Sequence, residues 1–416
     1  MTRSIDSQPM LTGSASADVG IVGAGFMGLA AALKLAREGA RVVVLEAAEV
    51  GWGASGRNNG LVAPGLKRDP HEVRRLLGRE AGDRLLRLSG DAPARVFGLI
   101  RQLGIRCDAE NKGWIQAAHS RFALGGVERR ARDWRTLGAD VRMIPRAEVA
   151  GRLGTGYYHG ASFDARGGSL NPLAYVRGLA SAAVAAGANI CTGTPATALN
   201  RAGGRWVIRT PHGTLDCDNV LLCTNAYGNN IEQLRATVIP LRTAQVASEP
   251  LPGNKTATIL PDGEAASDTQ RLLTSFRITA DNRLIMGGAS ATARDEHDRL
   301  VRHLHHAAAR RFPQLGSIRW QYGWSGYLAL TRDYLPVIRR HGDGLYSGIG
   351  CNGRGIAMAT VIGEQLADLV SGSVESDYAV PVSPAHRMLR FKLRQPGVAV
   401  AVVANRLLDQ LERRFS

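Results

Sequence analysis

Three glycines and one acid near the start of the chain have the types and spacing needed to hold phosphates and a ribose. Gly23, Gly25 and Gly28 form a GxGxxG pattern between a short apolar strand and a strongly helical run, and Glu46 ends the next apolar strand. The glycines permit a tight turn, a close approach of backbone to pyrophosphate, and close packing of helix on strand. The helix N-terminus offers N–H groups to phosphate, and Glu46 can accept ribose hydroxyls. We expect a dinucleotide other than NADP, whose 2′-phosphate Glu46 would repel; the alternative is a glycine-rich turn in an ordinary βαβ unit.

A second polar, glycine-rich loop follows the acid directly, at residues 51–60. It supplies backbone N–H groups, the Ser55 hydroxyl, the Arg57 guanidinium and the Asn58 amide, and it ends at Gly60. An NAD-binding domain would normally continue here with a plain helix. These donors suit a second face of a pyrophosphate or the edge of an isoalloxazine ring, which favours FAD over NAD.

A third glycine-rich turn lies near the other end of the sequence, in residues 346–360. Gly350, Gly353 and Gly355 precede an apolar helix that starts near Ile356. The N-terminus of such a helix carries a partial positive charge that could stabilise negative charge on a reduced flavin ring. We therefore expect these four residues to contact the cofactor.

The order of these motifs resembles that of the D-amino-acid-oxidase-type flavoprotein family, which includes glycine oxidase, sarcosine oxidase and γ-glutamylputrescine oxidase. The resemblance covers roughly residues 17–372, and the GASGRN run in the second loop is most similar to the γ-glutamylputrescine oxidase branch. Further matching motifs are Gly167–Pro172, Cys223–Tyr227, Arg283–Gly288 and Trp324–Pro336. The resemblance implies an FAD cofactor and adds Asn225 to the residues that contact it.

The chain departs from some relatives in how the flavin is attached and in how oxygen is activated. Covalently flavinylated members carry a histidine in the loop after the acid, or a cysteine just before the motif that contains Thr331 and Asp333; this chain has neither. Noncovalent FAD is therefore expected. Sarcosine-oxidase-like members have a lysine beside the strand that corresponds to Gly287–Gly288, where this chain has only leucine, isoleucine and methionine. That difference argues against fast reaction with oxygen.

The elements that must position these motifs predict an α/β fold. We expect a Rossmann-type FAD-binding domain and an interrupting α+β substrate domain built on an antiparallel sheet. The resemblance implies that the FAD-binding domain consists of residues 17–95, 155–228 and 322–372, and the substrate domain of residues 96–154 and 229–321.

Hydrophobic periodicity independently predicts several elements of both domains. These are a helix at 173–186, short strands at 188–193, 196–200, 206–210 and 220–223, antiparallel strands at 271–276 and 284–288, and a charged helix at 295–312.

Oxidation of an amine by a flavin needs positioning more than acid–base groups, so we expect an anchor for a substrate acid group and aromatic walls. Arg354 is the expected anchor because a guanidinium binds a carboxylate bidentately; the alternative is pairing with a flavin carbonyl or a phosphate. Arg57 could likewise bind a substrate carboxylate or pair with the cofactor, and the cofactor role is favoured. Tyr327 and Trp324 are expected to wall the pocket, and core packing is the alternative for Trp324. The resemblance places Arg277 on a strand near the substrate, but a solvent-facing arginine is the expected role.

Two other features could carry chemistry. His303, His305 and His306 have a spacing that suggests metal binding, but on a helix residue 305 points away from the other two and no acid or cysteine ligand follows nearby. We therefore expect no metal site. Cys351, beside the third turn, is expected to be a buried filler rather than a reactive thiol. Five cysteines without a CxxC pair indicate neither a disulfide framework nor a zinc ribbon.

The 416-residue chain has a net charge of +16, spread without a run of five like charges. Such a field attracts anionic ligands, nucleic acid or lipid head groups without choosing between them. The N-terminus lacks an apolar signal region, and no segment reaches 18 uninterrupted apolar residues. We therefore expect a cytoplasmic protein without a transmembrane helix.

Residues 373–416 extend beyond the part that resembles the family. From residue 387 onward, basic residues precede an apolar stripe formed by Val400, Val403, Leu407 and Leu411. The expected role is a helix that docks on the protein's own surface or on the partner subunit of a homo-oligomer. The alternative is peripheral membrane contact.

Together these features predict an FAD-dependent oxidoreductase that acts on a small primary or secondary amine bearing a carboxylate. The resemblance implies hydride transfer to flavin N5, hydrolysis of the resulting imine, and reoxidation by O2 to give hydrogen peroxide. One alternative is an amine dehydrogenase that passes electrons to a quinone or carrier at the membrane. Alternatives of other classes are a tRNA-modifying flavoenzyme and a flavin-binding sensor without turnover, although no nucleic-acid partner is expected.

Overall fold

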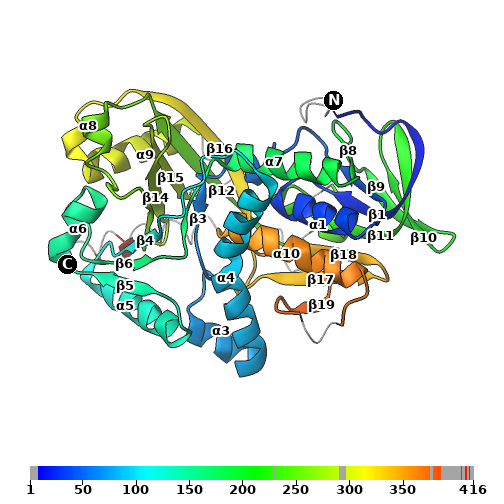
Figure 1. Ribbon diagram of the computed structural model, residues 1–416, viewed down its shortest axis with the longest axis horizontal. Coiled ribbons are helices and arrows are strands. Elements are labelled where there is room, and N and C mark those ends of the chain that lie inside the picture. The colour runs from blue at the N-terminus through cyan, green and yellow to red at the C-terminus, as the bar shows by residue number, and fades with distance from the viewer. Residues whose placement is uncertain are drawn as a thin grey trace.

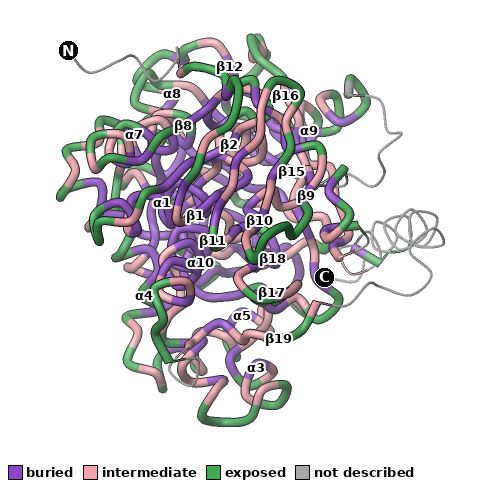
Figure 2. Tube along the Cα trace, turned by 90° about the vertical axis from the view of Figure 1, so that its right-hand side faces the viewer, coloured by how far each residue is buried: buried purple, intermediate pink, exposed green. Residues whose placement is uncertain are grey.

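The computed structural model describes residues 8–228, 230–235, 237–289, 297–374 and 378–385, together with Ala404, Leu408, Asp409 and Glu412. Two large β-sheets occupy different halves of the molecule, and the long helix α4 (Arg79–Leu103) lies near the middle (Figure 1). Buried residues concentrate in the strands and the helices packed on them, whereas exposed residues follow the outer loops (Figure 2).

The first sheet has nine strands in the order β19-β17-β18-β11-β1-β2-β8, with β10 and β9 attached beside β11. Its centre is parallel, since β1 pairs in parallel with β2 and β11, and β11 pairs in parallel with β18. β2 has the sequence Val-Val-Val-Leu and is buried at every position, as expected of a central parallel strand. The strands are β1 (Gly13–Val22), β2 (Val42–Leu45), β8 (Asn189–Cys191), β9 (Ala198–Ala202), β10 (Arg205–Arg209), β11 (Gly213–Leu222), β17 (Val337–Gly342), β18 (Leu345–Ile349) and β19 (Val382–Pro384).

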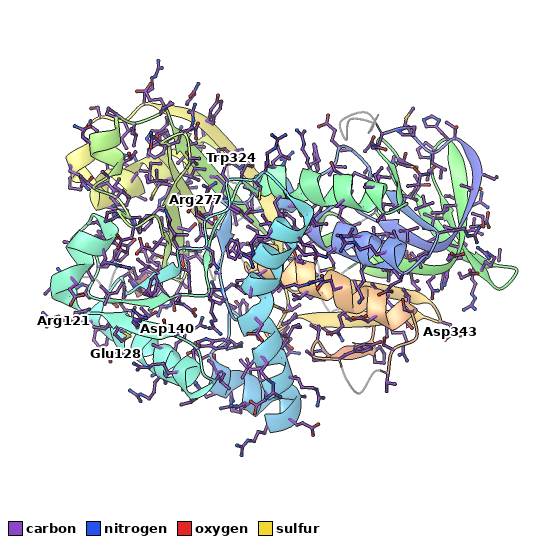
Figure 3. The ribbon with its side chains drawn as sticks, viewed as in Figure 1. Arg121, Glu128, Asp140, Arg277, Trp324 and Asp343 are labelled. Atoms are coloured by element: carbon purple, nitrogen blue, oxygen red, sulfur yellow. The ribbon has the colours of Figure 1, made fainter. Side chains whose placement is uncertain are left out.

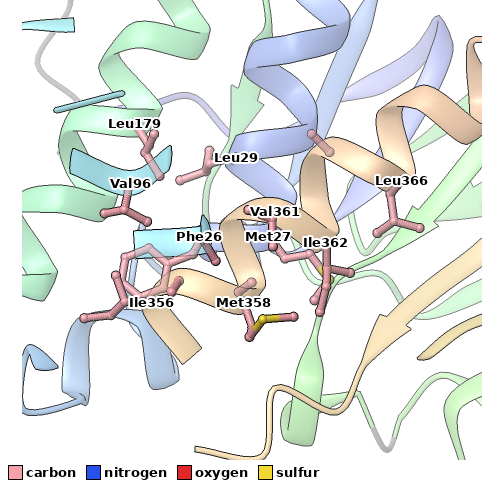
Figure 4. Close-up of a cluster of buried hydrophobic side chains, with 14 of the residues drawn as sticks. Phe26, Met27, Leu29, Val96, Leu179, Ile356, Met358, Val361, Ile362 and Leu366 are labelled. Carbon is pink, nitrogen blue, oxygen red and sulfur yellow. The ribbon is translucent and has the colours of Figure 1, made fainter. Parts of the chain in front are cut away.

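Helices α1 (Phe26–Arg37), α7 (Pro172–Ala185) and α10 (Gly355–Val370) form the helical layer of this half (Figure 1). α1 is rich in alanine and leucine, which favour helix formation. A Cβ at Gly363 of α10 would lie 2.2 Å from the carbonyl oxygen of Met27, so glycine is required for this close contact with α1. The apolar side chains around the contact include Phe26, Ile356, Met358, Val361, Ile362 and Leu366 (Figure 4).

The second sheet has eight strands in the order β16-β12-β15-β14-β13-β4-β6-β5. Its pairs are antiparallel apart from β13 with β4. The strands are β4 (Trp114–Ala117), β5 (Val141–Ile144), β6 (Ala161–Asp164), β12 (Ile239–Ser248), β13 (Ala265–Asp268), β14 (Thr274–Ile278), β15 (Leu284–Ala289) and β16 (Trp320–Leu330). Helices α5 (Arg121–Thr136), α6 (Arg146–Leu153), α8 (Gly253–Thr256) and α9 (His297–Arg311) belong to the same half (Figure 1).

Several short elements complete the fold. They are α2 (Ala54–Arg57), α3 (Pro70–Leu77), the small sheet of β3 (Leu61–Val62) and β7 (Gly168–Ser169), and the 3-10 turns Asn225–Tyr227, Glu232–Leu234 and Pro313–Leu315. α3 begins with a capping box, in which Asp69 and Glu72 bond to each other's backbone N–H groups, followed by Pro70. This cap fixes the direction in which the chain leaves the loop that precedes α3.

The α/β class predicted from the sequence is confirmed, and the predicted elements correspond to strands and helices of the structure. The helices predicted at 173–186 and 295–312 are α7 and, from His297, α9. The first strand starts at Gly13, earlier than predicted, because its N-terminal half pairs with β11 from Gly13↔Gly213 onward. Among the residues that the structure describes, no helix combines the length and apolar character required to cross a membrane.

Two strands that fall within the predicted FAD-binding segments belong to the second sheet. The predicted FAD-binding segments 155–228 and 322–372 include β6 and most of β16, but both strands pair within the second sheet. The limit at residue 322 falls inside β16, which pairs with β12 along nearly its whole length. Both strands therefore belong, by their pairing, with the second half of the molecule. The division into a cofactor domain and a substrate domain otherwise remains a proposal.

Candidate active site

A cavity of about 1070 Å³ lies between the two halves of the molecule. Its walls come from the loops that follow β1 and β2, from the turn before α10, from α5, and from strands β12 to β16 of the second sheet. This volume is at the top of the range found for small-molecule sites, so the cavity can hold a large cofactor and a substrate together.

The first glycine turn forms one end of this cavity, at the N-terminus of α1. Gly23 has φ +107°, and a Cβ at Gly28 would lie 2.1 Å from the carbonyl oxygen of Gly23. A Cβ at Gly25 would lie 2.8 Å from Ser55 Oγ, and this hydroxyl accepts a hydrogen bond from Phe26 N at 3.0 Å. The first turn of α1 carries no acidic residue and its N-cap residue makes no side-chain hydrogen bond. The positive end of the helix therefore remains available to an anion in the cavity.

Glu46 follows β2 and lines the cavity beside this turn. Its Oε2 accepts a hydrogen bond from Ala24 N at 2.8 Å, and its Oε1 accepts one from Ala48 N at 3.0 Å. Burial raises the pKa of the Glu46 carboxyl, while these backbone hydrogen bonds act in the opposite direction. Each carboxylate oxygen has a further lone pair. Glu46 can therefore brace the turn and still accept a ribose hydroxyl.

The side chains of the second loop are largely engaged within the protein. Arg57 Nε donates to the Trp52 carbonyl at 2.6 Å and Nη1 to the Ser325 carbonyl at 3.1 Å, with the guanidinium 4.4 Å from the Trp52 ring centroid. Asn58 donates to two carbonyls of its own loop and accepts from Gly60 N at 2.9 Å. Arg57 and Asn58 line the cavity, but Gly60 does not, and a Cβ there would lie 2.1 Å from a neighbouring carbonyl oxygen. The main role of these side chains is to hold the shape of the loop.

The third glycine turn and the residues that follow β11 form another part of the cavity wall, and the end of β11 lies beside the first glycine turn. Gly353, Gly355 and Ile356 line it, as does Asn225, which has φ +50°. Gly350 lies behind the wall, and a Cβ there would lie 2.6 Å from the carbonyl oxygen of Leu335. The structure thus brings together all the predicted cofactor-contacting residues except Gly28, Gly60 and Gly350, which shape the loops around the cavity.

Two cations face the cavity on the side of the second sheet. The Arg354 guanidinium lies 4.5 Å from the Trp114 ring centroid, and burial together with nearby Arg130 lowers the pKa of Arg354 to about 9. Lys67, which no sequence motif marks, lines the same cavity, and burial with Arg354 and Arg130 lowers its pKa to about 8. Arg130 itself pairs with Asp69, with Nε and Oδ1 2.5 Å apart. Within the described part of the chain, neither Arg354 nor the Lys67 ammonium makes an ion pair or side-chain hydrogen bond.

The aromatic wall differs from the predicted one. Tyr327 lines the cavity, and its backbone N donates to the Tyr227 hydroxyl at 2.9 Å. The Tyr227 ring also lines the cavity and lies edge-on between Trp52 and Tyr327, at centroid distances of 5.8 and 5.9 Å. Trp324 is outside the cavity wall, and its indole N–H donates to the Arg57 carbonyl at 2.8 Å (Figure 3). Tyr227, which belongs to a recognised motif, thus occupies the position expected for Trp324.

Arg277 is buried, and the expectation of a solvent-facing side chain was wrong. It is 5% exposed, and its Nε donates to the Asn59 carbonyl at 2.6 Å (Figure 3). Burial lowers its pKa to about 10. An inward arginine is stable on this strand because the loop containing Asn59 brings a carbonyl to it. Arg277 therefore attaches the second loop to the second sheet.

Two described residues of the C-terminal extension contact the edge of the cavity. Arg271 pairs with Asp409 at 2.7 Å and with Glu412 at 2.5 Å, and His119 Nε2 lies 3.3 Å from a Glu412 oxygen. His119 Nδ1 is 2.9 Å from Thr269 Oγ1, and burial lowers the pKa of His119. At these positions the extension docks on its own chain. The apolar stripe predicted at 400–411 lies outside the described residues.

The ligand atoms of His119, Asp409 and Glu412 are close enough together to hold a metal ion. The Arg271 guanidinium already pairs with both carboxylates, so we assign an ion-pair cluster. Two of the three helical histidines singled out in the sequence have other partners: His305 stacks on Trp320 at 4.9 Å, and His306 Nδ1 lies 2.8 Å from a carbonyl oxygen of its own helix. Cys351 is partly buried and lines the cavity, so it is not the fully buried filler that was expected, and desolvation raises the pKa of its thiol to about 12.

A Rossmann-type sheet, a glycine turn at a helix N-terminus and a second sheet across a shared cavity define a flavoprotein oxidoreductase fold. Residues 18–369 match the family described as FAD dependent oxidoreductase (DAO), and the chain belongs to this family. The chain is therefore an FAD-dependent oxidoreductase, and its relatives include proteins named gamma-glutamylputrescine oxidoreductase and glycine oxidase.

Individual relatives match over most of their length. A probable oxidoreductase OrdL of Rhizobium meliloti (strain 1021) is 32% identical over 380 residues, 89% of this chain and 86% of the relative. The gamma-glutamylputrescine oxidoreductase of Escherichia coli (strain K12) is 28% identical over 405 residues, 95% of each chain. The crystal structure of glycine oxidase from Geobacillus kaustophilus has the same fold, with a TM-score of 0.74 at 23% identity, covering 86% of this chain and 96% of that one.

The cavity fits FAD on the evidence of its own atoms. The glycine turn leaves the positive end of α1 uncovered, and Glu46 stands beside it. Thr224 and Gln245 line the cavity, and their Oγ1 and Oε1 atoms are buried without a hydrogen-bond partner in the described part of the chain. Unpaired buried polar atoms are costly, so a polar ligand that reaches them is favoured. The FAD ring system and its ribityl hydroxyls carry such donors and acceptors.

Proposed function

We propose that this enzyme oxidises a small primary or secondary amine that bears a carboxylate. The observation that supports this substrate class is Arg354, a guanidinium that lines the cavity without an acidic partner among the described residues. An arginine in a partly buried site binds a carboxylate through two parallel hydrogen bonds and so orients it. The relatives named gamma-glutamylputrescine oxidoreductase and glycine oxidase support an amine donor.

The cofactor in this proposal is noncovalent FAD, held along the cavity. Gly23 and Gly25 at the N-terminus of α1 would hold the pyrophosphate, and Glu46 the adenosine ribose. Gly353 and Gly355, at the N-terminal end of α10, would hold the isoalloxazine end. When bound, FAD supplies the two-electron acceptor for oxidation of the C–N bond.

The chain's own residues then act by binding and orientation. Arg354 holds the substrate carboxylate and thereby fixes the position of the neighbouring C–H bond. Tyr227 and Tyr327 form an apolar wall that limits water around the reacting carbon. The amine loses two electrons and two protons to become an imine, and water converts the imine to a carbonyl compound with release of ammonia or a shorter amine. Oxygen takes up the electrons and gives hydrogen peroxide.

The test is anaerobic bleaching of the purified yellow protein by an amine panel. Sarcosine, glycine, D-amino acids, proline analogues and γ-glutamyl polyamines cover the class. We expect at least one of them to bleach the flavin, and bleaching does not depend on which acceptor the cell provides. If none of these amines bleaches it, the proposal is wrong.

An amine dehydrogenase is the second candidate, because the sequence has no lysine next to Gly287–Gly288, where oxygen-activating relatives have one. A Cβ added at Gly287 would meet the uncharged groups Gln245 Oε1, Ser275 Oγ and Asn59 Nδ2, at 2.1, 2.9 and 3.1 Å. Admission of air to the bleached protein separates the two candidates. Return of the yellow colour within seconds with formation of hydrogen peroxide supports the oxidase. Slow return in air together with fast return on addition of a soluble quinone supports the dehydrogenase.

A further inference from the structure

The Lys67 ammonium is an unpaired cation in the cavity that the proposed reaction does not use. Lys67 lies between β3 and α3, and its backbone carbonyl accepts a hydrogen bond from Arg130 Nη2 at 2.8 Å. Lys67 lines the cavity and is an exposed residue, and the surrounding protein lowers the pKa of its ammonium to about 8. The backbone contact with Arg130 and the capping box of α3 hold this loop in place. Lys67 is thus held in the cavity and has no described partner there.

The charges near Lys67 leave two cations uncompensated. The pKa of Lys67 is lowered by Arg354 and Arg130 and raised by Asp268, after the larger effect of burial. Arg130 is neutralised by Asp69, and Asp268 is neutralised by Arg311 at 2.7 Å. Asp164, the acid whose charge raises the pKa of Arg354, pairs with Arg166 at 2.7 Å.

Farther along the wall, the carboxylates of Asp409 and Glu412 are both held by Arg271. The pair formed by Lys67 and Arg354 therefore keeps a local charge of +2. Unpaired charges in a partly desolvated cavity are costly, and they persist where a ligand needs them.

A substrate with one carboxylate would neutralise only half of this charge. Arg354 can take both oxygens of a single carboxylate through its planar fork, which leaves Lys67 without a partner. A lysine ammonium is a compact point charge that can pair with a second, separate acid group.

We propose that Lys67 and Arg354 together bind an amine that carries two acidic groups, with Arg354 holding one carboxylate and Lys67 the other. This inference rests on the proposed function and narrows its substrate class to doubly acidic amines.

Inert acids of matched length test the inference on the FAD-bound enzyme without any turnover. Butyrate carries one carboxylate and succinate two, on chains of four carbons. Their dissociation constants are read from the change in the visible flavin spectrum on titration at pH 7. We expect succinate to bind about 10-fold more tightly than butyrate, which corresponds to about 1.4 kcal/mol for the second charge pair.

Three variants assign the preference to Lys67. Lys67→Met should bring the ratio of the two dissociation constants close to one, and Lys67→Arg should restore most of it. Lys112→Met is the matched control, because Lys112 pairs with Glu110 at 3.3 Å and does not line the cavity, yet its loss changes the net charge equally. In the parent enzyme the preference for succinate should also weaken above pH 8, because Lys67 then loses its proton. The charged groups that act on this pKa are Arg354 and Arg130, which lower it, and Asp268, which raises it.

Two outcomes overturn the inference. Equal affinity for succinate and butyrate in the parent enzyme removes the second acid site. An equal loss of both affinities in Lys67→Met shows instead that one carboxylate bridges Lys67 and Arg354. Neither outcome bears on the proposed function, which is tested separately by the bleaching of the flavin with the amine panel.

Discussion

Replacement of Arg354 by methionine tests whether this side chain binds the carboxylate of the substrate. Methionine keeps a long apolar side chain that can pack on the Trp114 ring, where the guanidinium now lies at 4.5 Å, but it removes the charge and all the donors. We expect the dissociation constant of a carboxylate-bearing amine to rise strongly, because its acid group would enter the cavity without its partner.

The magnitude follows from the position of Arg354. Hydrogen bonds to charged groups contribute about 1.5–3 kcal/mol, and leaving a desolvated charge unpaired costs about 2–5 kcal/mol. Lys67 remains in the same cavity and attracts the carboxylate in part, so the lower half of this range applies. A loss of about 2–3.5 kcal/mol corresponds to an increase of about 30- to 400-fold in the dissociation constant.

The assay is anaerobic stopped-flow reduction of the flavin over a range of amine concentrations, which separates the dissociation constant from the limiting rate. Arg340→Met is the matched control, since Arg340 is also an arginine near an aromatic ring, 5.8 Å from that of Tyr346, but lies outside the cavity. The control should behave like the parent enzyme. An unchanged dissociation constant in Arg354→Met refutes the anchor role, and loss of bound flavin with unchanged amine affinity would assign Arg354 to the cofactor instead.

Four further outcomes are expected. Gly25→Ala should weaken FAD binding about 10- to 100-fold by overpacking the turn. Gly98→Ala, with no atom within 4 Å of the added Cβ, should retain FAD. Equal FAD content in the two variants would show that the turn at Gly25 does not hold the cofactor. Acid precipitation should release all the flavin into the supernatant, and a yellow pellet would show a covalent bond. Lys67→Met should raise the free energy of unfolding at pH 7 by on the order of 1 kcal/mol, because the folded protein lowers the pKa of Lys67 to about 8 and so disfavours its charged form. This gain in stability should shrink as the pH rises from 8 to 10.5. A gain that is independent of pH would refute the lowered pKa. Asp409→Ala should speed proteolytic loss of the C-terminal end about 10-fold by removing the Arg271 pair, as followed by mass spectrometry, and unchanged kinetics would show that the pair does not hold the extension.

The cofactor half of the molecule was largely predictable from the sequence because its motifs are local. The spacing from Gly23 to Glu46 is set by one strand, one helix and the next strand, so glycine positions and apolar runs suffice to place them. The same reasoning could not tell Gly25, which lines the cavity, from Gly60, which gives space to a carbonyl of another segment. That distinction depends on long-range packing.

The substrate side was less predictable because its residues come from separate strands and loops. Lys67 has no motif, and only the fold brings it near Arg354 and Arg130. Arg277 looks like a surface residue by type, yet a carbonyl from a loop more than 200 positions away makes its burial possible. The Thr-Asn-Ala-Tyr run was noted in the sequence, but nothing in it shows that the Tyr227 ring, rather than Trp324, faces the cavity.

The central claim, a flavin enzyme that recognises its amine through a carboxylate, is tested most directly by paired substrates. Each amino acid that bleaches the flavin anaerobically is compared with its own amide, which keeps the reacting C–N bond but lacks the negative charge. The account predicts that the amide reduces the flavin at least about 30-fold less efficiently, matching the loss expected for Arg354→Met. Equal efficiency for acid and amide would contradict it.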